Sequence, residues 1–364
     1  MDSVTFDAIT RALSRRSLAA AVIGVAAGAS ALATPDASAR KRRVRGEHNV
    51  RGNKAIMCIN GETKRVAKSK RKKWLKKGAT RGECQANPVC TPVCTSCNGG
   101  SDGCGGTCPV CTASQVCVNG ACKACNLTCD DTPIACGDAL DTALAAGGDI
   151  YLCPGLYEGT FSVDTNVNIY GAGGDTEDPA ISTILEVQPG DITQVMVIRG
   201  KDLTSVLISG VRVTGGNNGG FGGGIEIDMD GEVIIENSVI NKNRAWETVG
   251  LGGGIGLRAG NVTIRNSEIS ENEGYHGGGL YNDGATLTII DTTIRDNSAY
   301  ENGGGLFNDA GTTSLATTVA ITENDAATGG SGAGGGIYQG GGTVNVNGAT
   351  VNLNTPDQCS GVVC

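Results

Sequence analysis

The stretch GGGLYNDGATLTIIDTTIRDN, residues 277–297, carries the two motifs that decide the fold, a glycine triplet and an Ile-x-x-Asn motif. Both recur along the chain. The triplet, always followed by Ile or Leu, starts at intervals of 30, 25, 26 and 31 residues. Its five copies start at Gly222, Gly252, Gly277, Gly303 and Gly334. The asparagines of the second motif, in which Val once replaces Ile, are Asn243, Asn272, Asn297, Asn324 and Asn354. Because short alternating strand patterns separate the motifs, the period predicts a solenoid.

The triplets do not indicate nucleotide sites. A phosphate-binding loop is followed by a helix and usually contains a lysine, whereas predicted strands follow the triplets of this chain. Glycine instead tolerates a positive φ at the corner of a coil. Asparagines at one phase of successive coils are expected to stack, with their amides hydrogen-bonded along the axis.

These repeats resemble the GGA[IL] and FxxN repeats of polymorphic outer-membrane proteins, and more widely those of secreted bacterial β-helix proteins. The resemblance covers residues 205–364 well and 148–204 more loosely. It implies an all-β fold, a right-handed parallel β-helix (a solenoid) with one coil per repeat and about seven or eight coils. Asp131-Thr132-Pro133 predicts the start of a helix that ends at Gly147-Gly148. We expect this helix to cap the open end of the β-helix.

The sequence divides into four regions. We expect an export signal peptide in 1–39, a basic arm and disulfide-closed loop in 40–84, a Cys-rich disulfide module in 85–130, and the β-helix in 131–364. In the first region, Arg15 and Arg16 precede a mildly apolar run, and Ala37-Ser38-Ala39 offers a cleavage site. The region resembles a twin-arginine (Tat) signal, with an ordinary secretory signal as the alternative. We therefore expect a secreted or cell-surface protein that does not span a membrane.

The 16 cysteines of the chain support export. An even number in an exported chain indicates disulfides, although the Cys-x-x-Cys pairs leave a zinc ribbon open as the alternative. Residues 58–84 look like a short exported bacterial motif, and this resemblance implies a Cys58–Cys84 closure around a small basic helix. We expect Cys136 and Cys153 to tie the capping helix to the first coil, and Cys359 and Cys364 to pin the last coil.

Aligned coils place residues in columns on the outer face. The residue two places after each triplet should point outward, because side chains alternate along a strand. The column contains Glu226, Gly256, Tyr281, Phe307 and Tyr338. Glu226 and the three aromatic residues are our binding candidates. The rings could form a carbohydrate platform or a self-stacking ladder that stabilises the sheet.

The next outward column contains Asp228, Arg258, Asp283, Asp309 and Gly340. Asp228, Arg258 and Asp283 are the catalytic candidates, because parallel β-helix polysaccharide lyases are similar in placing carboxylates and a basic residue on such a face. The alternative is a surface salt-bridge ladder. We expect no cofactor; calcium at turns such as Asn282-Asp283-Gly284 remains an alternative, although no tandem nonapeptide calcium motif is present.

Charge separates the basic region from the rest of the chain. Residues 40–84 hold 17 Lys/Arg and 3 Asp/Glu, whereas residues 85–364 hold 9 and 31. Polysaccharide or an anionic cell-surface polymer is the expected partner, and nucleic acid is not, because basic and aromatic residues are not interleaved. We therefore expect a non-catalytic binding, adhesive or structural module. The alternative is a polysaccharide lyase or glycoside hydrolase of the parallel β-helix type.

Overall fold

The computed structural model describes residues 54–59, 62–77, 80–81, 107–108, 110–179, 181–246, 249–326 and 329–364. The expected export signal with Arg15 and Arg16 lies outside the described residues, as does Cys84 of the expected Cys58–Cys84 pair. The chain divides into two compact units, Met1–Ala86 and Asn87–Cys364.

The first unit contains a small antiparallel sheet. Strand β1 (Lys54–Ile59) pairs with β2 (Glu62–Ala67) and with β3 (Thr80–Arg81). The 3-10 turn η1 (Lys68–Lys70) and helix α2 (Arg71–Leu75) follow β2, so the basic helix expected here is present. Residues 54–57, which belong to the region expected to be a basic arm and loop, form part of β1, because the apolar run that ends at Ile59 has the strand propensity to pair with β2.

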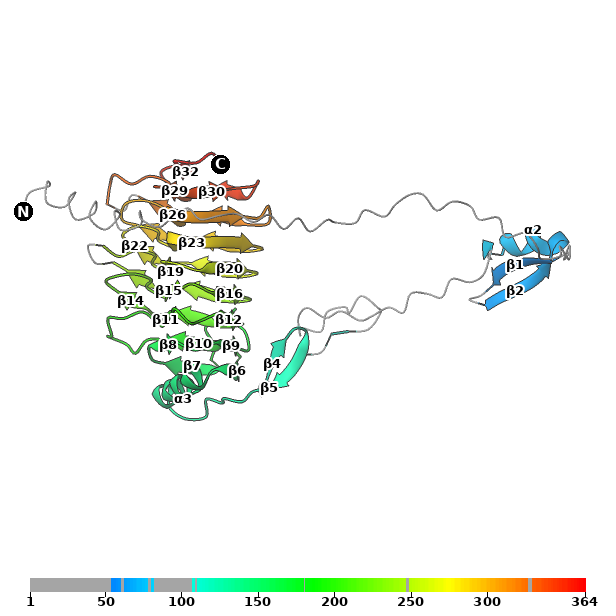
Figure 1. Cartoon of the computed structure of the whole chain (residues 1–364), viewed down its shortest axis with the longest axis horizontal. Coiled ribbons are helices and arrows are strands. Elements are labelled where there is room, and N and C mark those ends of the chain that lie inside the picture. Colours follow the sequence, from blue (N-terminus) through cyan, green and yellow to red (C-terminus); the bar gives the residue numbers. More distant parts are fainter. Residues whose placement is uncertain are drawn as a thin grey trace, which may run out of the picture. The chain divides into compact units, whose positions relative to one another are not determined.

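The second unit is a parallel β-helix in which every coil adds strands to the same columns (Figure 1). One column is an 8-stranded parallel sheet, in which eight strands are separated by seven turns of the β-helix. Its strands along the axis are β7 (Gly155–Glu158), β10 (Thr183–Glu186), β13 (Arg212–Thr214), β17 (Val239–Asn241), β21 (Glu268–Ser270), β24 (Thr293–Arg295), β27 (Ala320–Thr322) and β31 (Thr350–Asn352).

A 14-stranded sheet contains two further columns, which merge where β23 and β26 run through both. The first column has β6 (Gly148–Tyr151), β9 (Val167–Tyr170), β12 (Ser205–Ser209), β16 (Glu232–Glu236), β20 (Asn261–Arg265), β23 (Leu280–Ile290), β26 (Leu306–Leu315) and β30 (Thr343–Asn345). The second adds β8 (Phe161–Val163), β11 (Met196–Gly200), β15 (Ile225–Met229), β19 (Ile255–Leu257), β29 (Ile337–Gln339) and β32 (Cys359–Ser360). A 5-stranded sheet follows the 8-stranded one: β14 (Asn217–Asn218), β18 (Arg244–Ala245), β22 (Glu273–Gly274), β25 (Ser298–Ala299) and β28 (Asp325–Ala326).

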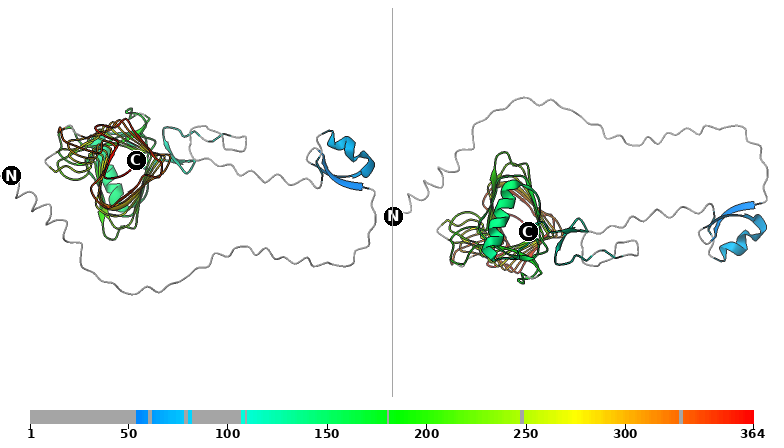
Figure 2. Two further views of the ribbon diagram at one scale, coloured as in Figure 1. Left: turned by 90° about the horizontal axis from the view of Figure 1, so that it is seen from above. Right: turned by 90° about the horizontal axis from the view of Figure 1, so that it is seen from below.

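Helix α3 (Pro133–Ala146) lies across the first coils and covers the end of the core (Figure 2, right). The Thr132 hydroxyl caps it by accepting a hydrogen bond from the Ala135 N–H, and Gly147 ends it, as the sequence predicts. Leu140 and Leu144 are fully buried against the apolar interior of the first coils. The helix therefore covers an edge that would otherwise be open for pairing with another chain.

The predicted asparagine ladder is present, and it is buried. Each amide Nδ2 donates to the Oδ1 of the asparagine one coil further on, from Asn243 through Asn272, Asn297 and Asn324 to Asn354. The same Oδ1 atoms accept the backbone N–H of the preceding asparagine. Beyond the last coil, the Gln358 side chain accepts from Asn354 Nδ2 and closes the ladder.

The glycine triplets form tight corners. Gly277, the first glycine of its triplet, has φ +63°, and a Cβ there would lie 2.3 Å from the Leu280 carbonyl oxygen. Gly279, the third, would place a Cβ 2.6 Å from the Gly305 carbonyl oxygen of the next coil. No other residue fits at these two positions without a shift of the backbone.

A two-stranded hairpin, β4 (Gln115–Val118) and β5 (Ala121–Ala124), precedes the β-helix and is held together by Cys111–Cys122. The expected direct tie between Cys136 and Cys153 is wrong. Cys153 of the first coil pairs with Cys125, and Cys136 of α3 pairs with Cys129. Both cysteines therefore bind the segment after the hairpin rather than each other, because that segment runs between the helix and the first coil.

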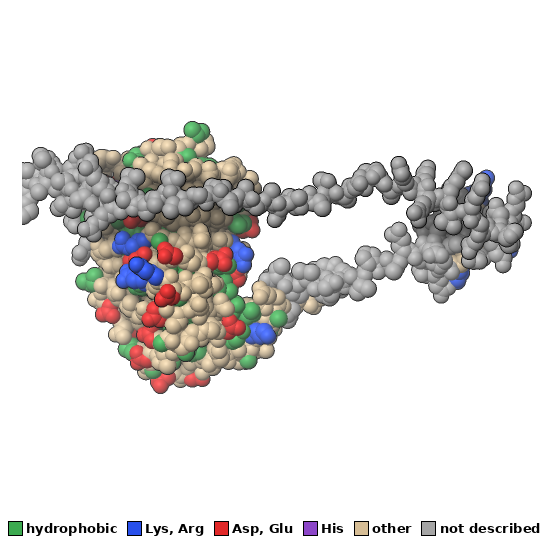
Figure 3. All heavy atoms as spheres, in the orientation of Figure 1, with side chains coloured by type: hydrophobic (Ala, Val, Ile, Leu, Met, Phe, Trp, Pro, Cys, Tyr) green, Lys and Arg blue, Asp and Glu red, His purple; other side chains and the backbone are tan. Residues whose placement is uncertain are grey.

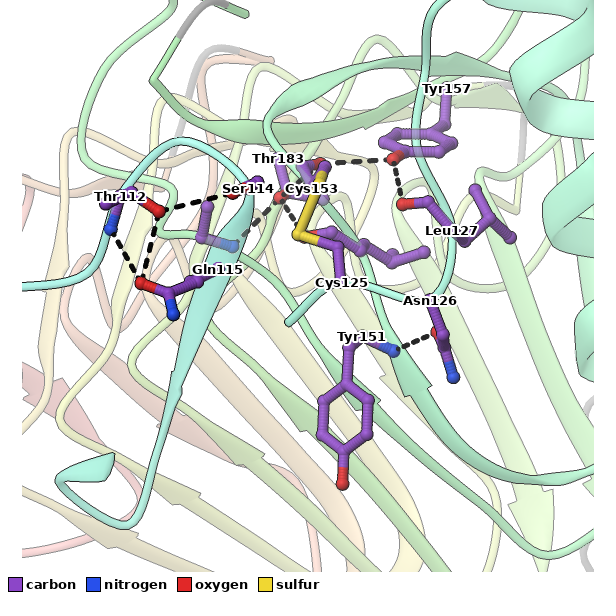
Figure 4. The surroundings of a disulfide bond; sticks show 12 residues. Thr112, Ser114, Gln115, Cys125, Asn126, Leu127, Tyr151, Cys153, Tyr157 and Thr183 are labelled. Atoms are coloured by element: carbon purple, nitrogen blue, oxygen red, sulfur yellow. Dashed lines mark hydrogen bonds between the residues drawn. A yellow bond between two sulfur atoms is a disulfide. The ribbon is translucent and has the colours of Figure 1, made fainter. Parts of the chain in front are cut away.

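Further contacts anchor this segment beside the Cys125–Cys153 bond (Figure 4). Asn126 accepts the Tyr151 N–H through its side chain, and its own backbone N–H donates to the Tyr151 carbonyl. The buried Tyr157 hydroxyl donates to the carbonyls of Leu127 and Cys153. At the other end of the chain, Cys359 and Cys364 form a disulfide with each other, as expected.

Candidate functional site

The predicted outer column has the expected register but is not exposed. Glu226, Gly256 and Tyr281 are paired in successive strands, and so are Phe307 and Tyr338. The rings of Tyr281 and Phe307 stack with centroids 5.0 Å apart, and those of Phe307 and Tyr338 lie 4.8 Å apart. Tyr281 is only 5% exposed and Phe307 only 7%, because Phe221 and Leu251 pack over them. The ring faces are therefore occupied by one another, as in a self-stacking ladder.

Glu226 lies in the same column, where two arginines hold it. Its side chain is 7% exposed, and its carboxylate accepts from Arg199 at 2.8 Å and from Arg258 at 3.0 Å. Arg258 also lies over the Phe221 ring at 3.8 Å. Asp228 lies 3.8 Å from Arg199. This arrangement favours an ion-paired surface over a free catalytic acid. Figure 3 shows Lys and Arg side chains beside Asp and Glu side chains on the face in view.

Asp283 differs from the other catalytic candidates. Its pKa is raised, first by burial and then by the Asp309 charge, while Arg258 lowers it. The predicted alignment of Asp283 with Asp309 is wrong by one residue, because Asp283 pairs with Ala310 at an irregularity in the strands. Nearby Gly311 turns with φ +73°, a conformation that Gly284 does not adopt. Asp309 instead accepts a hydrogen bond from the Tyr281 hydroxyl, and burial raises the tyrosine pKa.

A second aromatic column was missed. An aromatic residue follows three of the ladder asparagines at a spacing of three residues, so the repeat itself contains the signal for this column. These residues are Trp246, Tyr275 and Tyr300. Tyr275 and Tyr300 stack at 5.2 Å, and Trp246 meets Tyr300 edge-on at 5.9 Å. Tyr300 is 39% exposed. His276 contacts both Tyr275 and Phe307, so it joins this column to the first one.

The second unit has a groove of about 1470 Å³, which sequence reasoning also missed. Its floor follows the turns that lead into β13, β17, β21 and β24, and its wall is the outer face of those strands. Four coils at a spacing of about 4.8 Å span about 14 Å. Residues of the β4–β5 hairpin line it as well, so part of the module expected to be only disulfide-rich forms part of this concave surface.

The groove is polar and mostly charge-paired. Arg265 donates to Glu236 at 2.7 Å, and Arg295 donates to Glu268 at 2.7 Å. Asparagines lie between these pairs at the turns, with Asn266 donating to Asn237. The donors and acceptors therefore repeat from coil to coil, a pattern that suits hydroxyl groups along an extended chain.

One aromatic ring lines the groove. Tyr170 is half-buried and stacks on Tyr151 of the preceding coil with centroids 5.3 Å apart. Burial raises its pKa, and the nearby Asp149 carboxylate adds to the shift, so the hydroxyl stays neutral at physiological pH. A flat neutral ring beside rows of polar groups suits a ligand with both apolar and hydroxyl-bearing faces.

Within the described ranges, no group of three or more His, Cys, Asp or Glu side chains is arranged to hold a metal ion. Cys111, Cys122, Cys125 and Cys153 are disulfide-bonded rather than zinc ligands. No helix in the part of the chain that the structure describes is long and apolar enough to cross a membrane.

Comparison with known proteins supports the fold and leaves the activity open. Residues 195–362 match the family model described as Right handed beta helix region. Neither the curated proteins nor the solved structures contain a match to the chain. A fold of this kind does not itself determine function, which depends on the site. The matched residues and the parallel columns of strands show that the second unit folds as a right-handed parallel β-helix.

Proposed function

We propose that the protein is a non-catalytic, exported binding module that holds an extended polysaccharide in the groove. The groove itself is the observation that carries this proposal. It crosses four coils, repeats its polar groups at the coil spacing, and has a half-buried tyrosine among its lining residues. An open polar groove suits a polymer better than a small molecule, which would need an enclosed and mostly apolar pocket.

The state of the catalytic candidates favours binding over catalysis. Glu226 is held by two arginines, and Asp228 lies beside one of them. Tyr281 and Phe307 are buried in a stack and present no open ring. None of the three candidates Asp228, Arg258 and Asp283 lines the groove.

One observation favours the second candidate function, a polysaccharide lyase or glycoside hydrolase. Asp283 is accessible on the surface of β23, and partial desolvation of its carboxyl together with the Asp309 charge raises its pKa, as in general acids. An enzyme of this type would place the polymer on the face that carries β23 and β26.

A panel of immobilised polysaccharides separates the two functions. The binding module is expected to be retained on at least one polymer and to release no new chain ends on long incubation. Reducing or unsaturated ends that appear with the wild type and are lost in Asp283→Ala would establish the enzyme and refute our proposal. A chain that is retained on no polymer would refute both.

A further inference from the structure

Arg212, on β13, is an unusual arginine in the groove. The residue is only 7% exposed, yet it lines the groove. Its Nε donates to the Thr176 carbonyl at 3.1 Å, and its Nη1 donates to Asn241 Oδ1 at 2.8 Å. Both acceptors are neutral. Buried charges are normally paired with an opposite charge. Arg265 and Arg295, the other two arginines of the groove, are more exposed and each forms a salt bridge, whereas the buried Arg212 forms none.

The guanidinium has hydrogen-bonding capacity left. Two of about five N–H donors are used by the contacts above. Among the described residues, no carboxylate lies within salt-bridge distance of Arg212, and its Nη2 has no hydrogen-bond partner. The described part of the chain also has no fully buried side-chain nitrogen or oxygen without a partner. The Nη2 atom must therefore be accessible, and the groove is the concave surface that Arg212 lines.

Asn241 provides a second free donor beside the first. The residue is 3% exposed and lines the same groove. Because arginine can only donate, the Asn241 oxygen must face Arg212, which fixes the orientation of the amide. Its Nδ2 group has no partner among the described residues, so the same reasoning places it at the groove surface.

The rest of the groove limits which anion would fit. Asp175, Glu271 and Asp291 also line it and form no salt bridge within the described residues. Three arginines and six acidic residues line the groove, and Lys242 pairs with one of these acids, Glu177, so the acidic groups outnumber the basic ones by two. A polymer with a negative charge on every unit would be repelled by these acids, whereas one acidic group at Arg212 would not be.

We infer that Arg212 and Asn241 form a subsite for a single carboxylate of an acidic heteropolysaccharide, in which acidic units are separated by neutral ones. The inference rests on the proposed function and specifies its ligand. The carboxylate accepts from Arg212 Nη2 and Asn241 Nδ2, and neutral units extend along the paired charges of the other coils. A charge-assisted contact of this kind strengthens binding by roughly 10- to 100-fold.

The test uses fragments of a heteropolysaccharide with one hexuronic acid per repeating unit, together with the same fragments after reduction of the carboxyl to a hydroxymethyl group. Titration calorimetry on the full chain should show roughly 10- to 100-fold weaker binding of the reduced fragments. A homopolymer of hexuronic acid should also bind more weakly than the acidic heteropolysaccharide.

Asn241→Asp is the decisive variant. It keeps the size of the side chain and the Arg212 contact, and it supplies the missing negative charge from within the protein. Binding of the acidic fragments should fall to the level of the reduced ones, while the reduced fragments bind as before. Asn266→Asp adds the same charge elsewhere in the groove and removes the donor to Asn237, so it is the control for general repulsion and should weaken binding of the acidic fragments less than Asn241→Asp does.

Equal binding of acidic and reduced fragments would overturn the inference and leave the proposed function standing. The same loss in Asn241→Asp and Asn266→Asp would also overturn it, because general repulsion would then explain the effect. If neither kind of fragment binds, the proposed function itself fails. Far-ultraviolet circular dichroism of each variant verifies that the β-helix is intact.

Discussion

The asparagine ladder makes a strong prediction about stability. Asn297, in the middle of the ladder, is 1% exposed, and its side chain makes four hydrogen bonds. Its Oδ1 accepts the backbone N–H and the Nδ2 of Asn272, while its Nδ2 donates to the Ile269 carbonyl and to Asn324 Oδ1. Asn297→Ala removes all four bonds and leaves buried groups of the preceding coil without partners.

The expected cost follows from these bonds. At about 1 kcal/mol for each hydrogen bond, Asn297→Ala should lower the free energy of unfolding by about 4 kcal/mol. The control is Asn261→Ala, which changes an exposed asparagine on strand β20 and should cost less than about 0.5 kcal/mol.

Urea unfolding followed by far-ultraviolet circular dichroism measures both variants, with the midpoint and slope fitted together. Coils of a solenoid contact only their neighbours, so a separate early transition of the coils around Asn297 would also agree with the prediction. A loss of less than about 1 kcal/mol in Asn297→Ala, with no early transition, would show that the ladder does not stabilise the stack.

Three further predictions concern other parts of the second unit. Burial lowers the pKa of His276, so the unfolded state binds the proton more readily and the free energy of unfolding should fall as the pH drops below about 6.5. Urea unfolding at pH 7 and at pH 5.5 measures this decline, which should be smaller in His276→Gln. The same decline in His276→Gln and in the wild type would contradict the prediction. Replacing Cys125 and Cys153 by serine should loosen the hairpin and weaken polysaccharide binding measured by calorimetry, whereas unchanged affinity would mean that the hairpin does not contribute to the site. Phe307→Ala should lower the free energy of unfolding in urea by about 3 kcal/mol, because the ring is stacked on both sides. Tyr338→Ala, at the end of the stack, should cost less. A larger cost for Tyr338→Ala would show that the stacked aromatic residues do not stabilise the β-helix as a ladder.

The fold could be predicted because its signals repeat. A glycine at a tight corner and an asparagine in a buried ladder recur once per coil from Gly222 onward, so Gly277 and Asn297 each have counterparts in the neighbouring coils. The register of Tyr281 and Phe307 followed from the same alignment. Their burial did not, because it depends on Phe221 and Leu251, which lie outside the aligned strands.

The groove could not be predicted by reading single columns. Its lining combines turn residues such as those before β17, residues of the strands that follow these turns, and residues of the β4–β5 hairpin from an earlier part of the chain. Arg212 occupies a strand position with no arginine counterpart in the aligned coils, so no repeat singles it out. The disulfide partners of Cys136 and Cys153 were also beyond reach, because spacing does not reveal how the segment between residues 125 and 136 returns past the helix.

We propose that an extended polysaccharide lies in the groove across the coils. This proposal is tested most directly by the affinity of a retained polysaccharide as a function of fragment length, in the wild type and in two matched variants. Thr293→Trp places a bulky ring inside the groove, whereas Thr263→Trp places the same ring on β20, outside the groove. We expect the affinity to rise with fragment length until the groove is filled, to be lost in Thr293→Trp and to be kept in Thr263→Trp. Affinity that is unchanged in Thr293→Trp, or lost only in Thr263→Trp, would contradict it.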